Sequence, residues 1–96
     1  MRIKNLDPDT LRAWLDQGTI VLIDVREDHE YVDEHIDEAH HMPLSAFDPG
    51  SLPEYEGQVV VYHCASGQRT ANYGPQLMAA VSGACEVYHL DGGITA

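Results

Sequence analysis

Two uninterrupted runs of apolar, mostly β-branched residues constrain the fold of this chain more than any other feature. The first is IVLIDV at residues 20–25, and the second is VVVYH at residues 59–63. Neither run alternates apolar with polar residues, as a strand with one solvated face would do. Both are therefore predicted to be strands covered on both faces, which requires a sheet between two other layers.

Helical segments separate these predicted strands from their neighbours. Before the first run, Asp7 is a helix N-cap, Pro8 suits the first helical position, and Gly18 follows the last apolar position. The apolar residues at helical spacing between them are Leu11, Trp14 and Leu15. A helix is therefore predicted to begin at Pro8 and to end at Gly18.

The remaining elements are weaker in the sequence. Residues 27–38 predict a short helix and a turn, residues 39–44 a short strand, and residues 86–90 a third strand closed by a turn at 91–93. Residues 69–81 predict a helix that kinks or restarts at Pro75. Because parallel neighbours need crossover connections, we expect an α/β fold of three layers, with a small, mainly parallel sheet flanked by helices.

Composition narrows the possible functions. The 96 residues allow one domain, 1–96, and their net charge of −11 argues against binding to nucleic acid or anionic lipid. No apolar run is long enough to span a membrane, so we expect this domain to make no membrane contact itself. Two cysteines are too few for a disulfide framework, which favours free thiols in a reducing, cytoplasmic location.

The loop after the second run carries the chemistry that the sequence indicates. Cys64 leaves a buried strand and precedes a predicted helix, so backbone N–H groups favour its thiolate. Arg69 adds a positive charge for an anionic substrate, and Gln68 is uncharged. The small residues that let the backbone curl around a bound anion are Ala65, Ser66 and Gly67. This arrangement predicts a nucleophilic cysteine rather than an inert buried one.

Four segments, in order, match a known pattern. They are Leu22-Ile23-Asp24-Val25-Arg26-Glu27 with Glu30-Tyr31, His35-Ile36 with Ala39 and Met42-Pro43-Leu44, His63-Cys64 with Arg69-Thr70, and Leu90-Asp91-Gly92-Gly93-Ile94. At these residues the chain resembles the rhodanese-like sulfurtransferase domains over nearly its whole length. The resemblance implies a rhodanese-like fold and no cofactor or metal.

The resemblance also implies a double-displacement reaction. Cys64 would take the outer sulfur of thiosulfate or a persulfide, hold it as a cysteine persulfide, and pass it to a thiol or cyanide acceptor. Arg69 and the N–H groups of residues 65–68 would stabilise the anionic intermediate. Two roles remain open for Thr70, whose hydroxyl either bonds the sulfur or caps the helix.

Other residues are interpreted as structural. Arg26 is expected to pair with a carboxylate such as Glu30 and so to tie the first predicted strand to the following turn. Asp24 is expected to be structural with it, and a catalytic role for these two residues is the alternative. Because neighbours along a strand point to opposite faces, His63 is interpreted as a packing or supporting residue rather than a general base. Cys85 is expected to be buried, and the alternative is that it resolves the Cys64 persulfide.

Histidines among carboxylates raise the question of a metal site. Eight of the sixteen acidic residues lie between Asp24 and Glu38. The histidines in or near that segment are His29, His35, His40 and His41. No pair of them has the spacing of a known zinc motif, so a solvated acidic face is favoured over a metal site. This segment is distant from Cys64 in sequence. Its negative charge is therefore interpreted as a property of the protein surface rather than of the site.

Two departures from the family pattern bear on the substrate. Many thiosulfate-active members have a second basic residue where this chain has Ala65. A persulfide on a small thiol or on a fused or partner sulfur-handling protein is therefore an attractive donor. The family also continues beyond the point where this chain ends at Ala96, so we expect a domain excised from a longer polypeptide.

Two other functions remain as alternatives. Phosphatases and arsenate reductases that share the fold have five residues between their cysteine and arginine, whereas four separate Cys64 from Arg69 here. The shorter loop fits a sulfur atom better than a tetrahedral oxyanion. A non-catalytic interaction module is the other alternative, although such modules usually lack the cysteine.

Overall fold

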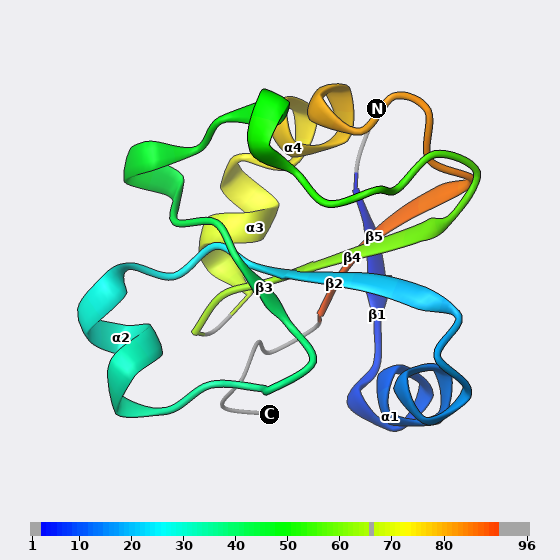
Figure 1. Cartoon of the computed structure of the whole chain (residues 1–96), viewed down its shortest axis with the longest axis horizontal. Helices are drawn as coiled ribbons and strands as arrows, with labels where there is room; N and C mark the ends of the chain where they lie inside the picture. The colour runs from blue at the N-terminus through cyan, green and yellow to red at the C-terminus, as the bar shows by residue number, and fades with distance from the viewer. Residues whose placement is uncertain (1–2, 66, 91–96) are drawn as a thin grey trace.

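A five-stranded sheet forms the centre of the molecule (Figure 1). The computed structural model describes residues 3–65 and 67–90. The strands, in chain order, are Lys4–Leu6 (β1), Ile20–Asp24 (β2), His40–His41 (β3), Val59–His63 (β4) and Glu86–Leu90 (β5). They lie in the order β1-β5-β4-β2-β3, and every neighbouring pair is parallel. The prediction of a mainly parallel sheet is confirmed, and the predicted turn at 91–93 lies outside the described residues.

Within residues 3–65 and 67–90, four helices and two short 3₁₀ turns connect the strands. The helices are Pro8–Gln17 (α1), Asp28–Asp33 (α2), Gln68–Asn72 (α3) and Gly74–Ala80 (α4), and the 3₁₀ turns are Leu44–Ala46 and Pro49–Ser51. In Figure 1, α1 lies on one side of the sheet and α3 and α4 lie on the other. The three-layer α/β fold is thus confirmed. Within the described residues, no helix has both the length and the apolar character needed to cross a membrane.

The core divides into two apolar clusters, one on each face of the sheet. One face packs β2 and β4 against α4, and its buried residues include Val60, Tyr62 and Leu77. The other face packs against α1, and its buried residues include Leu11 and Val61. Successive residues of β4 therefore enter opposite clusters. This two-sided burial is the physical reason for the unbroken apolar runs.

Helix α1 has the ends that the sequence predicts. The Asp7 carboxylate accepts a hydrogen bond from the backbone N–H of Thr10 at 3.0 Å. At the other end, Gly18 has φ +67° and donates its N–H to carbonyls of the last turn. A left-handed residue of this kind closes a helix with no Cβ penalty only when it is glycine.

The segment from 68 to 80 is two helices rather than one. They meet at Tyr73, and Pro75 lies in the first turn of α4, where its missing N–H breaks no helical hydrogen bond. The predicted restart at Pro75 is confirmed. Strand β1 was not predicted, because its three residues include Lys4 and Asn5 and its pairing partner β5 is distant in sequence.

Candidate active site

Cys64 is the first residue after β4, a central strand, and lies at the carboxyl end of the parallel sheet. Its side chain is buried. Gly67 adopts φ +87° as the N-cap of α3, which turns the backbone so that its N–H donates to the Cys64 Sγ at 3.1 Å. The α3 helix has only five residues, so individual N–H groups rather than a long helix dipole act on the sulfur.

These donors determine the charge of the thiol. Burial raises the pKa of Cys64. The N–H and hydroxyl of Thr70 and the N–H groups of Gly67 and Arg69 together lower the pKa by more than burial raises it, so the pKa of Cys64 lies below its ordinary value. Hydrogen bonds to an anion favour its charged form most strongly where water is excluded. The thiolate of Cys64 is therefore stabilised by its own loop, as the sequence predicts.

Thr70 contacts the sulfur and does not cap the helix. Its Oγ1 lies 3.7 Å from Cys64 Sγ and 3.1 Å from the carbonyl oxygen of Gly67, which is the N-cap. The same Oγ1 also lies 2.8 Å from Nδ1 of His89 on β5. Of the two roles left open for Thr70, the structure supports the bond to sulfur.

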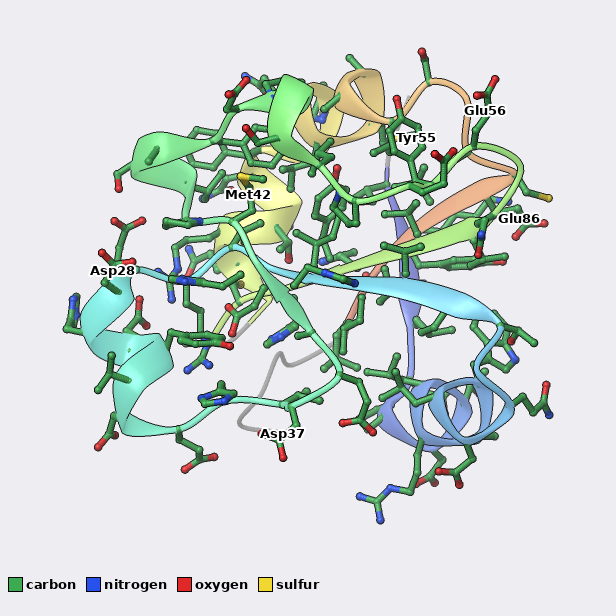
Figure 2. All side chains as sticks on the ribbon, viewed as in Figure 1. Asp28, Asp37, Met42, Tyr55, Glu56 and Glu86 are labelled. Atoms are coloured by element: carbon green, nitrogen blue, oxygen red, sulfur yellow. The ribbon has the colours of Figure 1, made fainter. Side chains whose placement is uncertain are left out.

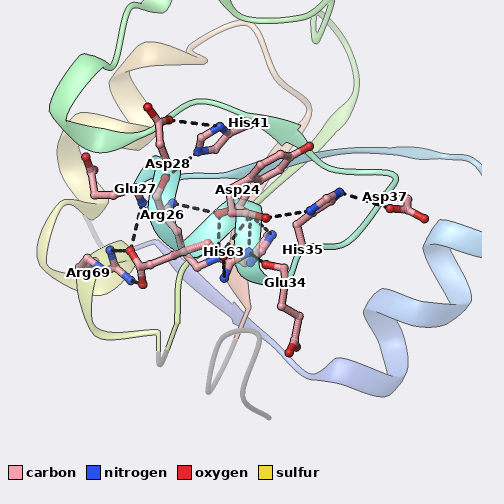
Figure 3. Close-up of polar contacts among 12 residues, drawn as sticks. Asp24, Arg26, Glu27, Asp28, Glu34, His35, Asp37, His41, His63 and Arg69 are labelled. Carbon is pink, nitrogen blue, oxygen red and sulfur yellow. Dashed lines mark hydrogen bonds and ion pairs between the residues drawn. The ribbon is translucent and has the colours of Figure 1, made fainter.

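Arg69 forms a two-point ion pair that the sequence did not predict. Its two terminal nitrogens donate to the two carboxylate oxygens of Glu30 on α2, each at 2.7 Å. These bonds from Arg69 lower the pKa of Glu30 to about 2, and Glu30 raises the pKa of Arg69. The Cys64 sulfur is a further contributor to the raised pKa of Arg69. The guanidinium thus lies near both groups, and its charge is largely matched by Glu30. Figure 3 shows Arg69 with dashed lines for its polar contacts.

The prediction that Arg26 pairs with the carboxylate of Glu30 is wrong. Arg26 forms its ion pair with Asp24, at 2.8 Å, and takes only the backbone carbonyl of Glu30. A second bond, of 2.6 Å, reaches the carbonyl of Glu34 at the end of α2. The carboxylate of Glu30 is already engaged by Arg69, which is far away in sequence. The Asp24–Arg26 pair still ties β2 to the following helix, as the interpretation expected.

The acidic segment is also closer to the cysteine loop than its sequence position suggests. Because Glu30 on α2 bonds Arg69, the segment that is distant from Cys64 in sequence contacts the residues next to the cysteine loop. Sequence separation could not reveal this, since α2 follows β2 and the loop follows β4, and these two strands are neighbours in the sheet.

His63 is fully buried beside Asp24. The two residues are register partners on β4 and β2, and Nε2 of His63 lies 3.6 Å from the Asp24 carboxylate. Neither ring nitrogen has a hydrogen-bond partner within the described residues. Burial lowers the pKa of His63, and the Asp24 charge opposes that shift only in part. This places His63 as a neutral packing residue.

The other loop residues and the second cysteine occupy different settings. Ala65 is partly exposed, Gln68 is exposed, and Ser66 lies outside the described residues.

Cys85 is exposed, so its predicted burial is wrong. Its backbone N–H donates a hydrogen bond to the carbonyl oxygen of Gln58, the residue before β4. Cys64 follows the other end of β4, so at about 3.3 Å per residue the two cysteines lie roughly 20 Å apart. A resolving role for Cys85 is therefore contradicted by the sheet topology.

Two of the histidines form an aromatic stack. Tyr31 lies between His35 and His41, with ring centroids 4.1 Å apart on each side. Across residues 3–65 and 67–90, no three His, Cys, Asp or Glu side chains gather closely enough to hold a metal ion. Packing against Tyr31 thus accounts for the two histidines without a ligand role.

Comparison with known proteins places the fold and the cysteine loop in a family. A family model for the rhodanese-like domain matches residues 7–96. The chain belongs to the rhodanese-like family. The Thermoplasma volcanium rhodanese-related protein has the same fold, with a TM-score of 0.77 at 22% identity over 95% of this chain and 86% of that one.

Two curated relatives of this rhodanese-like chain are longer proteins. An uncharacterized Synechocystis protein is 42% identical over 89 residues, which are 93% of this chain and 49% of that protein. A probable adenylyltransferase/sulfurtransferase of Mycobacterium tuberculosis is 38% identical over 98 residues, which are 95% of this chain and 24% of that protein. The rhodanese-like chain thus spans half or less of the length of these relatives.

Proposed function

We propose that this domain is a rhodanese-type sulfurtransferase that works through a persulfide on Cys64. The observation that carries the proposal is the ring of donors around the sulfur, formed by N–H groups of the loop and the hydroxyl of Thr70. The same donors that stabilise a thiolate would stabilise the terminal sulfur of a persulfide, which is also anionic. The Mycobacterium tuberculosis relative, a probable adenylyltransferase/sulfurtransferase, supports the same reaction class.

The reaction consists of two displacements at sulfur. The Cys64 thiolate attacks the outer sulfur of the donor, and a new S–S bond forms as the donor's own bond to that sulfur breaks. The electron pair leaves with sulfite when the donor is thiosulfate, or with a thiolate when it is a persulfide. A thiol or cyanide acceptor then attacks the outer sulfur, and the electron pair of the breaking bond returns to Cys64.

The charge of the site favours a persulfide over thiosulfate as the natural donor. Thiosulfate carries two negative charges, whereas the guanidinium of Arg69 is already paired with Glu30. Ala65 supplies no second cation. A persulfide on a small thiol or on a fused or partner sulfur-handling protein carries less charge into the site. A thiolate nucleophile of this kind fits a reducing compartment such as the cytoplasm.

Intact-protein mass spectrometry tests the proposal directly. After incubation with thiosulfate or a thiol persulfide, we expect the mass of one added sulfur, which cyanide then removes. The adduct should be absent in Cys64→Ser and retained in Cys85→Ser, a matched control because Cys85 is the exposed thiol at the other end of the sheet. An adduct that persists in Cys64→Ser, or turnover of an aryl phosphate without any adduct, would contradict the proposal.

A further inference from the structure

A chain of buried polar atoms leads from the candidate nucleophile to the neighbouring strand. Cys64 Sγ lies 3.7 Å from Thr70 Oγ1, which lies 2.8 Å from His89 Nδ1. Cys64 and Thr70 are both 0% exposed, and His89 is 6% exposed. Bulk water is therefore largely excluded from these three groups, so each depends on partners within the protein for its hydrogen bonds.

The direction of the Thr70 O–H bond decides whether a proton or a lone pair of the hydroxyl faces the sulfur. A hydroxyl has one proton to donate, and three acceptors lie around Thr70: Cys64 Sγ, the Gly67 carbonyl and His89 Nδ1. If the hydroxyl donates to His89, its lone pairs face the sulfur and repel an anion there. If His89 donates its Nδ1–H to Thr70, the hydroxyl proton remains free to turn to the sulfur.

We propose that His89 is a positioning residue that donates to Thr70 and thereby directs the Thr70 hydroxyl onto the anionic sulfur of Cys64. This role rests on the proposed function, because the sulfur becomes anionic both as the thiolate and as the persulfide. An anion attracts the hydroxyl proton more strongly than the neutral Gly67 carbonyl does, since charge-assisted hydrogen bonds are the stronger ones.

The sheet explains how a residue of β5 reaches the cysteine loop. His89 is the register partner of Tyr62, two residues before Cys64, on the strand adjacent to β4. Thr70 lies in the first turn of α3, which begins from the same loop. The imidazole therefore lies beside the first turn of α3, even though 24 residues lie between Cys64 and His89 in the chain.

Two variants of His89 separate donation from packing. His89→Asn places an amide N–H at the same bond separation from Cα as Nδ1, whereas His89→Leu fills the space without a donor. Both are made in the Cys85→Ser background, so that Cys64 is the sole thiol. The readouts are the thiolate absorbance near 240 nm as the pH is raised, kcat/KM for sulfur transfer, and thermal unfolding to confirm that each variant is folded.

We expect His89→Leu to displace the thiolate titration of Cys64 to higher pH and to lower kcat/KM about tenfold, the effect of one hydrogen bond to a charged group. His89→Asn should restore most of both. Equal defects in the Leu and Asn variants, with both folded, would overturn the proposal, because packing rather than donation would then explain them.

A double-mutant cycle tests whether His89 acts through Thr70. Thr70→Val keeps the side-chain shape and removes the hydroxyl, so in that background His89→Leu should have little further effect on the titration. Full additivity would overturn the proposal. The titration needs no sulfur donor, so it decides the role of His89 even if Cys64 accepts no sulfur and the proposed function fails.

Discussion

At the scale of single residues, the Glu30–Arg69 pair determines how much positive charge the site offers to an anion. The side chains are 23% and 34% exposed, so solvent screens the pair in part but does not separate it. The two-point geometry, with both bonds at 2.7 Å, also holds the guanidinium in one orientation. Glu30 thus positions Arg69 and at the same time neutralises it.

Replacing Glu30 with glutamine separates these two effects. Glu30→Gln keeps the side-chain length and one oxygen acceptor for Arg69 but removes the negative charge. Because Arg69 would then be an uncompensated cation, we expect the KM for thiosulfate to fall roughly two- to fivefold. Steady-state kinetics at fixed ionic strength measure it.

Glu34→Gln is the matched control for that variant. Glu34 also belongs to the acidic segment, but its backbone carbonyl, not its carboxylate, bonds Arg26. An equal fall in KM for both variants would show that total charge is responsible rather than the pair with Arg69. A higher KM in Glu30→Gln would show that positioning outweighs neutralisation.

The burial of His63 should make the stability of the protein depend on pH. Burial lowers the pKa of His63 in the folded state, so below about pH 6.5 the unfolded chain takes up a proton at this residue more readily than the folded chain. Stability is therefore fully present above pH 6.5 and is lost as the pH falls towards the lower, folded pKa. The pKa of Asp24 is also lowered, against its burial, but from 3.8, so its contribution is lost only in more acidic solution.

The variant His63→Leu should reduce this pH dependence of stability. We expect the free energy of unfolding of the parent protein, measured in urea between about pH 5 and pH 8, to decline on the acid side. In His63→Leu the decline over the same range should be smaller. Parallel curves for the two proteins would mean that His63 does not contribute to it.

At the scale of elements, helix ends and strand register build the site. Gly67 starts α3 in the left-handed region and thereby points its N–H at the sulfur, while Pro75 allows a new helix to begin after Tyr73. The register between β2 and β4 then sets Asp24 against His63. The positions of Gly67 and Pro75 depend on local backbone geometry that these residue types favour, whereas the Asp24–His63 pairing depends on how β2 and β4 align.

The C-cap of α1 offers a stability test away from the site. A Cβ on Gly18 would meet no atom within 4 Å, so only the backbone conformation, φ +67°, opposes a side chain there. We expect Gly18→Ala to lower the free energy of unfolding by about 1 kcal/mol. Gly18→Asn should cost less, because asparagine adopts the left-handed region more readily. Denaturant unfolding measures both, and an unchanged stability in Gly18→Ala would contradict this account of the cap.

At the scale of the whole molecule, the net charge of −11 opposes the approach of anionic donors. The carboxylates are spread around the fold: Figure 2 shows Asp28 and Asp37 on the side of α2, and Glu56 and Glu86 near the start of β5. The field is therefore repulsive from several directions. Local N–H groups bind an anion only after it has reached the loop.

Added salt should then speed the capture of an anionic donor. Raising the ionic strength from about 0.02 to 0.2 M shortens the screening length from about 20 Å to about 7 Å, which screens most of the charges that lie away from the loop. We expect kcat/KM for thiosulfate to rise over this range, while that for an uncharged donor changes little. A steep decrease for thiosulfate would show instead that attraction within the loop dominates the distant field.

Much of the architecture could be predicted from the sequence because it depends on local patterns. The apolar runs at 20–25 and 59–63, the caps of α1 and the break at Pro75 are properties of residues a few positions apart, and burial on both faces follows from the absence of alternation. The position of Cys64 between a buried strand and a small-residue loop is equally local. These features determined the α/β fold and the candidate nucleophile.

Only the tertiary structure decided which charged and polar groups surround that nucleophile. The pairs Arg69–Glu30 and Thr70–His89 join residues from different elements, and β1 acquires its partner from the far end of the chain. No local pattern encodes such contacts, because they depend on strand order in the sheet. The sequence by itself therefore determined the kind of fold and the reactive sulfur, whereas the parallel packing of β2, β4 and β5 decided which side chains from other elements surround that sulfur and how much positive charge is left for an approaching anion.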